Sequence, residues 1–400
     1  MSVIKLMDGL YSVGVLNPAL RVFDVVMKTE YGTSYNAYLL KGEKNVLIDT
    51  VHARHFEEYI ENVKSLVDLK SLDYIILNHN EPDHSGSLER LIKIAPQIQI
   101  LTSPAGKIYL PFITNDPMIN MRAVRDGETL DIGGGKTLQF IHAPFLHWPD
   151  SMFTWFEQDQ IAFTCDFLGT HFCEPTMSDA LVQYKQAYYQ TFKSYFDAIF
   201  GPFKSYVQKG LDKLKALDVK FVCPSHGPVL RRGVFLEEAM LAYDDWSTPK
   251  RHEHPVIPIF YCSAYGCTGR LAVKIAEGIN HVLPAATVSM YDLVHVSPCS
   301  LCETINEADA FCIGSPTINK NALPPVWELI HMLEGTNCKG RRAALFGSYG
   351  WSGEALPLLS THLKSLNVDV FEDGCRCRFV PSETELQEAY DFGVRFAKSL

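Results

Sequence analysis

The six-residue stretch His79–His84, with the sequence HNEPDH, restricts the fold of this chain more than any other feature. It follows the apolar run Tyr74–Leu77, which predicts a buried strand, and precedes Ser85–Leu88, which predicts the start of a helix. In an extended loop, the side chains of His79, Glu81 and Asp83 would point to the same side. A solvated turn is the alternative, because Asn, Pro and Asp favour turns. Two histidines and two carboxylates are more than a turn requires: His79, Glu81, Asp83 and His84.

Three further ligand-type residues occur near or directly after apolar segments in the first half of the chain. They are His147 in the segment Leu146–Asp150, Asp166 directly after Ile161–Cys165, and His226 after the strand-like Val219–Val222. Each of them alone is better explained as a structural residue. A binuclear metal site, however, draws its ligands from several loops, and four such loops together predict one. Histidine mixed with carboxylate suits iron better than an imidazole-rich set, which suits zinc.

The second half of the chain repeats a pattern of strand, polar loop and helix. The predicted strand Val256–Tyr261 is followed by the loop Cys262–Gly269 and by a helical pattern over Leu271–Ile279. Backbone N–H groups at such a helix start can bind a phosphate group, together with nearby hydroxyls. The predicted phosphate contacts are Ser263, Ala264, Gly266, Cys267 and Thr268.

Two later loops follow the predicted strands Ala310–Gly314 and Ala343–Gly347. Doubly wound sheets bind their ligands at the carboxyl ends of parallel strands, so these loops can bracket a flat ring. The predicted contacts are Pro316, Thr317, Ile318, Asn319, Ser348, Tyr349, Gly350, Trp351 and Gly353. Tyr349 and Trp351 are alternatively packing residues, although the neighbouring glycines disfavour a packed core. The arrangement is flavodoxin-like, and without a GxGxxG fingerprint it predicts FMN and not FAD.

Length and charge favour a two-domain protein with small-molecule partners. The 400 residues fit two domains, predicted as 1–250 and 254–400, with the polar stretch Asp244–Pro255 between them. The histidines of that stretch are interpreted as part of a solvated linker. A net charge of −10 disfavours nucleic acid and anionic membranes as partners. Eleven cysteines, with no signal-peptide pattern and no membrane-length apolar run, predict reduced thiols in the cytoplasm.

The combined pattern resembles the flavodiiron proteins (A-type flavoproteins). The resemblance covers essentially the whole chain and depends on the segments HNEPDH, LHWPDSMF, PSHG, SPTINK and GSYGWSGE. It implies an α/β and α+β fold, in which a metallo-β-lactamase-like αββα sandwich precedes a flavodoxin-like doubly wound parallel sheet. Hydrolases of the first fold usually read HxHxDH, whereas this chain has Glu81 at the second histidine position. That exchange favours redox chemistry over hydrolysis.

The resemblance also implies cofactors, activity and partners. Members of this family reduce dioxygen to water, nitric oxide to nitrous oxide, or both, at a non-haem diiron centre that FMN supplies with electrons. The implied ligands are His79, Glu81 and His147 for one iron, Asp83, His84 and His226 for the other, and Asp166 as a bridge. Members differ in whether the residue at the position of His84 coordinates. The implied donor is rubredoxin or reduced deazaflavin, and the implied assembly is a head-to-tail homodimer or a dimer of such dimers.

Some positions depart from the family pattern. The segment Phe167–His171 replaces a sequence close to AFGQH, and its histidine is interpreted as a packing neighbour of the metals. Cys267 and Gly269 stand where Ser or Asn and Glu are frequent. The pairs Cys299/Cys302 and Cys375/Cys377 are interpreted as thiols, because a rubredoxin iron site needs two CxxC knuckles. Two alternatives remain open at this point: a zinc-dependent hydrolase with a flavodoxin-like domain, and an electron carrier whose first domain is vestigial.

Overall fold

The computed structural model describes residues 3–25, 27–248, 252–336 and 338–400, and the side chains at positions 299, 300, 302 and 303 lie outside the description. The chain divides into two compact units, Met1–Thr248 and Pro249–Leu400. The predicted domain boundary at 250–254 falls partly on residues 249–251, which lie outside the described residues.

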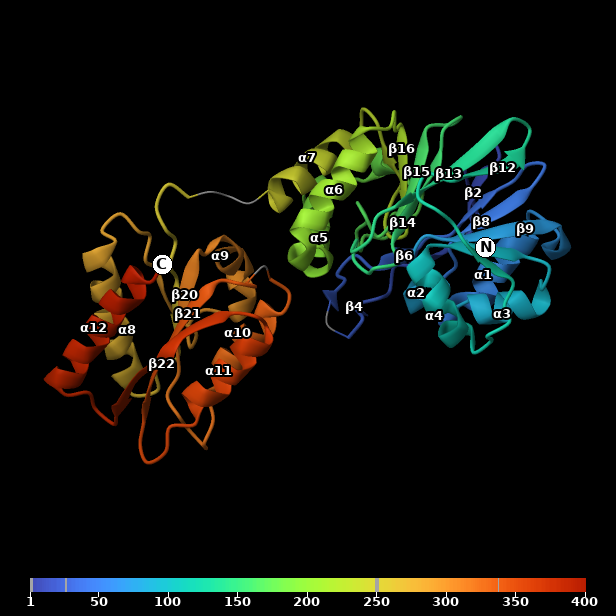
Figure 1. Ribbon diagram of the computed structural model, residues 1–400. Coiled ribbons are helices and arrows are strands. Elements are labelled where there is room, and N and C mark those ends of the chain that lie inside the picture. Colours follow the sequence, from blue (N-terminus) through green and yellow to red (C-terminus); the bar gives the residue numbers. More distant parts are fainter. Residues whose placement is uncertain (1–2, 26, 249–251, 337) are drawn as a thin grey trace. The chain divides into compact units, whose positions relative to one another are not determined.

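The first unit contains two sheets that pack face to face (Figure 1). In spatial order, the strands of the first sheet are β1 (Ile4–Met7), β2 (Leu10–Ser12), β7 (Tyr38–Leu40), β8 (Asn45–Ile48), β9 (Leu72–Leu77), β10 (Gln99–Thr102) and β11 (Met121–Ala123). Those of the second sheet are β12 (Thr129–Gly133), β13 (Lys136–His142), β14 (Met152–Phe156), β15 (Ile161–Cys165), β16 (Phe221–Pro224) and β17 (Leu230–Arg231). The remaining strands of this unit form two antiparallel pairs: β3 (Val15–Asn17) with β6 (Thr33–Tyr35), and β4 (Val22–Phe23) with β5 (Met27–Lys28).

Alternating side chains explain how each sheet of the first unit is buried on both faces. In β9, Ile76 belongs to the core between the two sheets, whereas Ile75 and Leu77 belong to the core under the helices of the first sheet. In the second sheet, Phe163 faces the core between the two sheets, and Ala162 faces the helices on the outer face of this sheet. The apolar residues therefore require one helical layer on each outer face, and the predicted αββα sandwich is confirmed.

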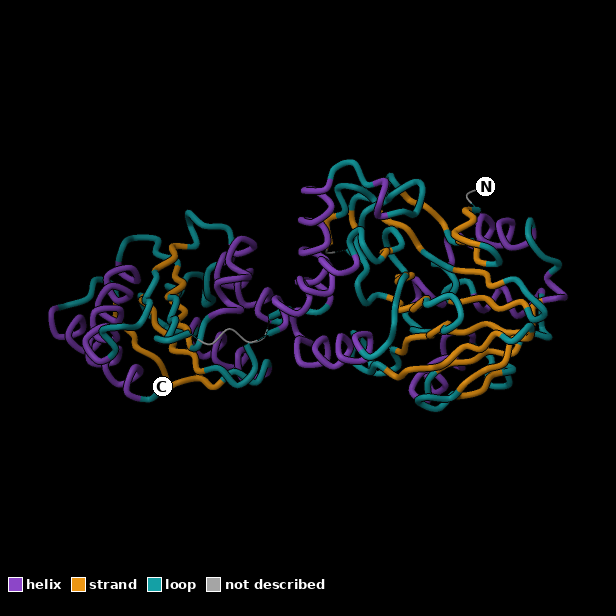
Figure 2. The backbone as a smooth tube through the Cα atoms, turned by 90° about the horizontal axis from the view of Figure 1, so that it is seen from above, coloured by secondary structure: helices purple, strands orange, loops and turns teal. Residues whose placement is uncertain are grey.

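The helices of the first unit form these two outer layers (Figures 1 and 2). On the first sheet they are α1 (Phe56–Lys64), α3 (Leu88–Ile94) and α4 (Pro104–Thr114), with the short α2 (Pro82–Ser85) preceding α3. On the second sheet they are α5 (Lys185–Ile199), α6 (Lys204–Lys215) and α7 (Leu236–Ser247). Single 3₁₀ turns occur at Ala53–His55, Leu69–Ser71, Asp179–Leu181 and Gly201–Phe203.

The second unit is built on one five-stranded parallel sheet. Its strands, in spatial order, are β19 (Met290–Asp292), β18 (Ile259–Tyr261), β20 (Ala310–Gly314), β21 (Arg342–Tyr349) and β22 (Asp369–Arg378). In order of sequence this is 2-1-3-4-5, the order of flavodoxin-like sheets. The predicted doubly wound parallel sheet is thus confirmed.

Helices cover both faces of this sheet (Figure 1). They are α8 (Cys267–Val282) and α12 (Glu383–Lys398) on one face, and α9 (Cys302–Glu307), α10 (Pro324–Leu333) and α11 (Ala355–Ser365) on the other, with a 3₁₀ turn at Pro298–Leu301 before α9. In β20, Phe311 and Ile313 face the second group of helices, whereas Ala310 and Cys312 face the first. Among the described residues, no helix combines the length and apolar character that crossing a bilayer requires.

Three element boundaries differ from the sequence predictions. The strand predicted from Val256 begins at Ile259, since Pro258 has no N–H group to donate to a neighbouring strand. Helix α8 begins at Cys267, one turn before the apolar pattern that predicted it. Strand β21 continues to Tyr349, because Ser348 and Tyr349 remain paired with β22.

Candidate metal centre and flavin-binding loops

The structure brings all seven predicted metal ligands together at one edge of the first unit. Their donor atoms form two groups, each with all atoms within 4.8 Å of one another: His79, Glu81, His147 and Asp166 in the first, and Asp83, His84 and His226 in the second. These residues follow β9, β15 and β16 or lie in the connection from β13 to β14. The strands thus supply a fixed frame, and the segments after them supply the donors.

In the first group, two imidazoles converge on one carboxylate. Nε2 of His79 lies 3.2 Å from Oε2 of Glu81, and Nε2 of His147 lies 3.1 Å from the same oxygen. A metal with bonds of 2.0–2.2 Å to N and O ligands holds neighbouring donor atoms about 3 Å apart. The spacing within this group therefore fits ligands that share one ion.

In the second group, two imidazoles likewise converge on one carboxylate oxygen. Nε2 of His226 lies 3.0 Å from Oδ2 of Asp83, and Nε2 of His84 lies 3.3 Å from that oxygen. The other carboxylate oxygen of Asp83, Oδ1, is buried without a hydrogen-bond partner among the described residues. A buried, unpaired carboxylate oxygen is costly, and a metal cation in this group would satisfy it.

Asp166 connects the two groups. Its Oδ2 lies 3.7 Å from Nε2 of His147 in the first group, and its Oδ1 lies 3.1 Å from Nε2 of His84 in the second. The two oxygens of one carboxylate thus face different groups, as a bridging ligand requires. The hydroxyl of Tyr195 donates a hydrogen bond of 3.0 Å to Oδ1 and helps to orient it.

Electrostatics favour positive charge at this position. Burial acts to lower the pKa of His79, but the carboxylates of Asp150 and Glu81 outweigh it and hold this pKa well above its ordinary value. Burial acts to raise the pKa of Asp166, but His84 beside it holds that pKa well below its usual range. Metal cations supply the same positive charge, so metal binding is expected to release protons from the imidazoles.

Contacts at Nδ1 orient two of the imidazole rings, those of His226 and His79. Nδ1 of His226 donates to the backbone carbonyl of Ser34 at 2.6 Å. Nδ1 of His79 lies 3.2 Å from both carboxylate oxygens of Asp150, which also accepts the Asn80 N–H at 2.7 Å. Both contacts leave Nε2 as the metal-facing atom, the usual arrangement behind a ligating histidine.

The variant Asp150→Asn should retain its fold and hold iron about 10- to 100-fold more weakly, since it loses the carboxylate that orients His79. The measurement is the iron retained per chain during dialysis against a graded series of chelator concentrations. Glu157→Gln, on the exposed turn after β14, is the matched control. Equal iron retention in Asp150→Asn and wild type would show that Asp150 has no part in metal binding.

The predicted loop geometry of residues 79–84 is wrong in one respect. Pro82–Ser85 form the helical turn α2, with Pro82 at its first position, where proline suits a helix start. Asp83 and His84 therefore reach the site from a helical turn, not from an alternating extended loop. His171 is a buried neighbour: its Nδ1 lies 2.8 Å from the Thr33 hydroxyl, and its ring packs 4.9 Å from that of His226.

Sequence reasoning did not identify Asp150 and Tyr195 as neighbours of the metal ligands. Asp150 lies in the quoted segment LHWPDSMF, so its position beside His147 was a usable signal. Tyr195 lies on α5, and its distance of 29 residues from Asp166 along the chain carries no such signal.

The three predicted flavin loops meet at the carboxyl edge of the parallel sheet. The Thr268 hydroxyl lies 2.9 Å from that of Ser348, and the Thr317 N–H donates to the Ser348 carbonyl at 2.8 Å. Close approach of the second and third loops requires glycine at Gly347, because a Cβ there would lie 2.1 Å from the carbonyl oxygen of Ser315.

The same edge fits a phosphate and an aromatic ring. Gly266, which precedes α8 with a φ of 80°, has no side chain to cap the helix. The Ser263 hydroxyl accepts the N–H of Gly269, the third residue of the helix, at 3.0 Å. The N–H groups that the helix start offers to an anion are therefore those of Cys267 and Thr268. Trp351 is 77% exposed, so it is not a core residue. The remaining predicted contacts lie in these loops or in the adjoining ends of α8 and β21: Ser263, Ala264, Cys267, Pro316, Ile318, Asn319, Tyr349, Gly350 and Gly353.

Cys375 and Cys377 are free, buried thiols on β22, and burial raises the pKa of each to about 12. They are therefore protonated at neutral pH. The side chains of Cys299 and Cys302 lie outside the described residues.

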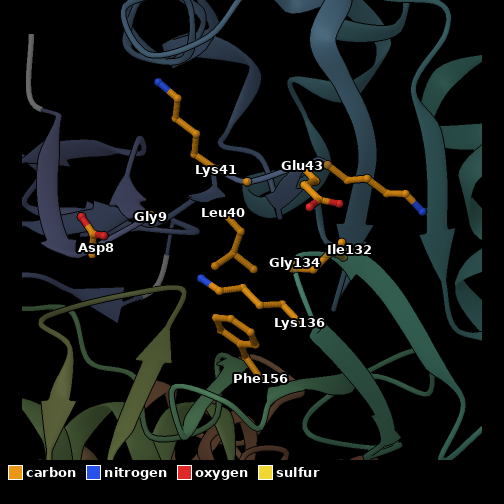
Figure 3. Close-up of a pocket in the computed structure, with 12 residues that line it drawn as sticks. Asp8, Gly9, Leu40, Lys41, Glu43, Ile132, Gly134, Lys136 and Phe156 are labelled. Carbon is orange, nitrogen blue, oxygen red and sulfur yellow. The ribbon is translucent and has the colours of Figure 1, made fainter.

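A cavity of about 110 Å³ in the first unit is separate from the metal groups, because none of its lining residues belongs to them (Figure 3). Lysines surround it, but Lys41 donates to the Leu66 carbonyl and Lys44 to the Asp131 carbonyl. The ammonium of Lys136 lies over the Phe156 ring, 5.6 Å from its centroid. These lysines are thus engaged by the protein itself, and the cavity is not assigned an anion.

Comparison with known proteins agrees with this two-part architecture. Residues 33–227 match the family described as ODP family beta lactamase, and residues 259–393 match the flavodoxin family. The chain is 57% identical to Flavo-diiron protein FprA2 of Clostridium acetobutylicum over 100% of both chains. It is 32% identical to the anaerobic nitric oxide reductase flavorubredoxin of Aeromonas hydrophila, over 93% of this chain and 74% of that one.

Among solved structures, the rubredoxin oxygen:oxidoreductase of Desulfovibrio gigas superimposes with a TM-score of 0.77 at 27% identity, over 99% of this chain and 98% of that one. Full-length identity of more than half, the order of the two folds and the paired donor groups all lead to one assignment. The chain belongs to the flavodiiron proteins, a family of oxidoreductases whose cofactors are FMN and a non-haem diiron centre.

Proposed function

We propose that this chain reduces dioxygen to water, nitric oxide to nitrous oxide, or both. The observation that carries the proposal is the bridge: Asp166 presents one oxygen to each of two donor groups, so two metal ions would be held side by side. The bound irons supply the electron transfer and the coordination of the gas. Reduction of one dioxygen consumes four electrons and four protons, and coupling of two nitric oxide molecules consumes two of each.

The proposed iron ligands are His79, Glu81, His147, Asp83, His84, His226 and the bridging Asp166. In the first group, the side chains of Glu81 and His147 are 21% and 14% exposed. In the second group, those of Asp83, His84 and His226 are 7%, 1% and 2% exposed. The first group therefore has one side open to solvent, through which a diatomic gas can enter. The second group lies deeper, and its buried histidines hold the bridge in place.

The first unit is better suited to this redox chemistry than to zinc-dependent hydrolysis. Glu81 adds a carboxylate to the first group where the hydrolases have an imidazole, and mixed N/O sets suit iron. The proposed flavin loops on the same chain supply an electron source that a hydrolase does not need.

The test is steady-state consumption of each gas, under one fixed reductant and with metals measured in the same preparation. Two irons per chain together with turnover of at least one gas is the expected result. Two zincs and no gas consumption would favour the hydrolase, and a chain without metal would favour an electron carrier. The proposed electron donor is rubredoxin or reduced deazaflavin, and comparing the two as the fixed reductant identifies which one supports the faster rate.

We also propose a head-to-tail homodimer, alone or paired into a tetramer, in which the FMN of one subunit reduces the irons of the other. The warrant is the family resemblance together with the location of the two sets of residues in separate compact units.

A complementation experiment tests the dimer. Asp166→Asn removes the metal bridge, and Gly347→Val forces apart the loops at Ser315 and Ser348, which should remove FMN. Each variant alone should be inactive. After subunit exchange, about half of the dimers pair one variant with the other, and each carries one complete FMN–iron pair, so the mixture should recover about one quarter of wild-type activity. Heterodimers that form by mass and remain inactive would exclude transfer between subunits.

A further inference from the structure

We propose that the second unit carries a separate binding site for a divalent transition metal, formed by His331, Glu334 and His362. This site is independent of the diiron centre and of the flavin loops. His331 lies in the last turn of α10, Glu334 caps that helix three residues later, and His362 lies on α11. The site thus connects two neighbouring helices.

The donor atoms already face one another. Oε1 of Glu334 lies 3.2 Å from Nε2 of His362 and 3.5 Å from Nδ1 of His331, and all three atoms lie within 4.8 Å of one another. The two imidazole rings are 5.7 Å apart and nearly perpendicular, at 85°. Ligands that share one zinc ion stand about 3.3 Å apart, so a bound ion would require only small side-chain rotations.

Two imidazoles and one carboxylate form a recognised zinc-ligand set. Zinc sites of this composition leave the fourth position to water. Because copper and zinc bind N/O ligands more tightly than ferrous iron does, the site is expected to select them over iron. The diiron groups, in contrast, contain a bridging carboxylate and lie within a buried frame.

The surroundings distinguish this group from an ordinary surface ion pair. The Trp327 ring lies 5.9 Å from that of His362 and 6.5 Å from that of His331, and its Nε1 donates to Oδ1 of Asn321 at 2.9 Å. The Trp327 ring, held by this hydrogen bond, thus lies beside both imidazole rings. The side chains of His331 and His362 are 66% and 29% exposed, so an ion in solution can reach them directly.

Metal binding here would join the two helices that follow the proposed flavin loops. Helix α10 follows the loop after β20, and α11 follows the loop after β21. A ligand that binds the folded state stabilises it by mass action. Zinc should therefore raise the temperature at which FMN is released from the protein.

The experiment uses the full chain loaded with iron and FMN and dialysed against increasing Zn²⁺, with zinc, iron and flavin measured per chain. Wild type should bind one zinc without loss of iron. His331→Ala, His362→Ala and Glu334→Gln should each weaken this binding by about tenfold or more, since one of three ligands is lost. The zinc-dependent rise in the FMN release temperature should disappear in the same variants.

His281→Ala is the matched control, because His281 is a histidine in the last turn of α8, beside Tyr390. It should bind zinc as wild type does. Glu334→Gln keeps the size of the side chain, so its flavin content and circular dichroism should match those of wild type. Equal zinc binding by wild type and all three variants, or zinc uptake only with loss of iron, would overturn the proposal.

Discussion

Replacing Asp166 with asparagine should reduce turnover of dioxygen and nitric oxide by more than about 100-fold while FMN stays bound. Changes behind a metal ligand typically cost 10- to 100-fold, and Asp166 is itself the residue that faces both donor groups, at 3.1 Å from His84 and 3.7 Å from His147. Asparagine keeps the size of the side chain but loses the charge and one of the two oxygens. The measurements are iron per chain and initial rates with each gas.

Flavin content separates this result from general unfolding. The second unit has its own cores on both faces of its sheet, so Asp166→Asn should bind FMN as wild type does. Asp159→Asn, on the turn between β14 and β15, is the control for an Asp-to-Asn change outside the donor groups. Full iron content with wild-type turnover in Asp166→Asn would refute the bridging role.

Replacing Gly278 with valine should destabilise the second unit by about 3 kcal/mol or more. A Cβ at Gly278 would lie 2.1 Å from the Tyr390 carbonyl oxygen, and one at Gly393 would lie 2.3 Å from the Ile275 carbonyl oxygen. Helices α8 and α12 therefore contact each other backbone to backbone through both glycines. Since neither carbonyl is free to move without breaking its helix, the helices must separate and expose the core under them.

Urea unfolding measures this effect, with the fluorescence of the released FMN as the signal. Gly335→Ala is the control in the same unit, because a Cβ there would meet its nearest atom, the Met332 carbonyl oxygen, at 3.7 Å. Iron should remain bound to Gly278→Val at urea concentrations that release its flavin, since the metal groups belong to the other unit. Simultaneous loss of iron and flavin would show that the two units unfold as one.

The sequence determined the two folds through local chemistry. Apolar runs such as Ile161–Cys165 and Ala310–Gly314 coincide with β15 and β20, because a strand buried on both faces reads as a continuous apolar segment. Ligand-type residues at the ends of such runs identified the candidate metal centre. Local patterns were less informative at Pro82–Ser85 and at Cys267, where capping and packing decide where a helix starts.

Only the tertiary structure decided which distant side chains meet. The hydrogen bond from Tyr195 to Asp166, the contact of Asp150 with His79, and the meeting of His331 with His362 join residues 29, 71 and 31 positions apart. Periodicity assigns a residue to a face of its own helix or strand, and only the packing of that element against others brings two such faces together. The chemistry of each donor was therefore readable from the sequence, while its partners were set by how the sheets and helices pack.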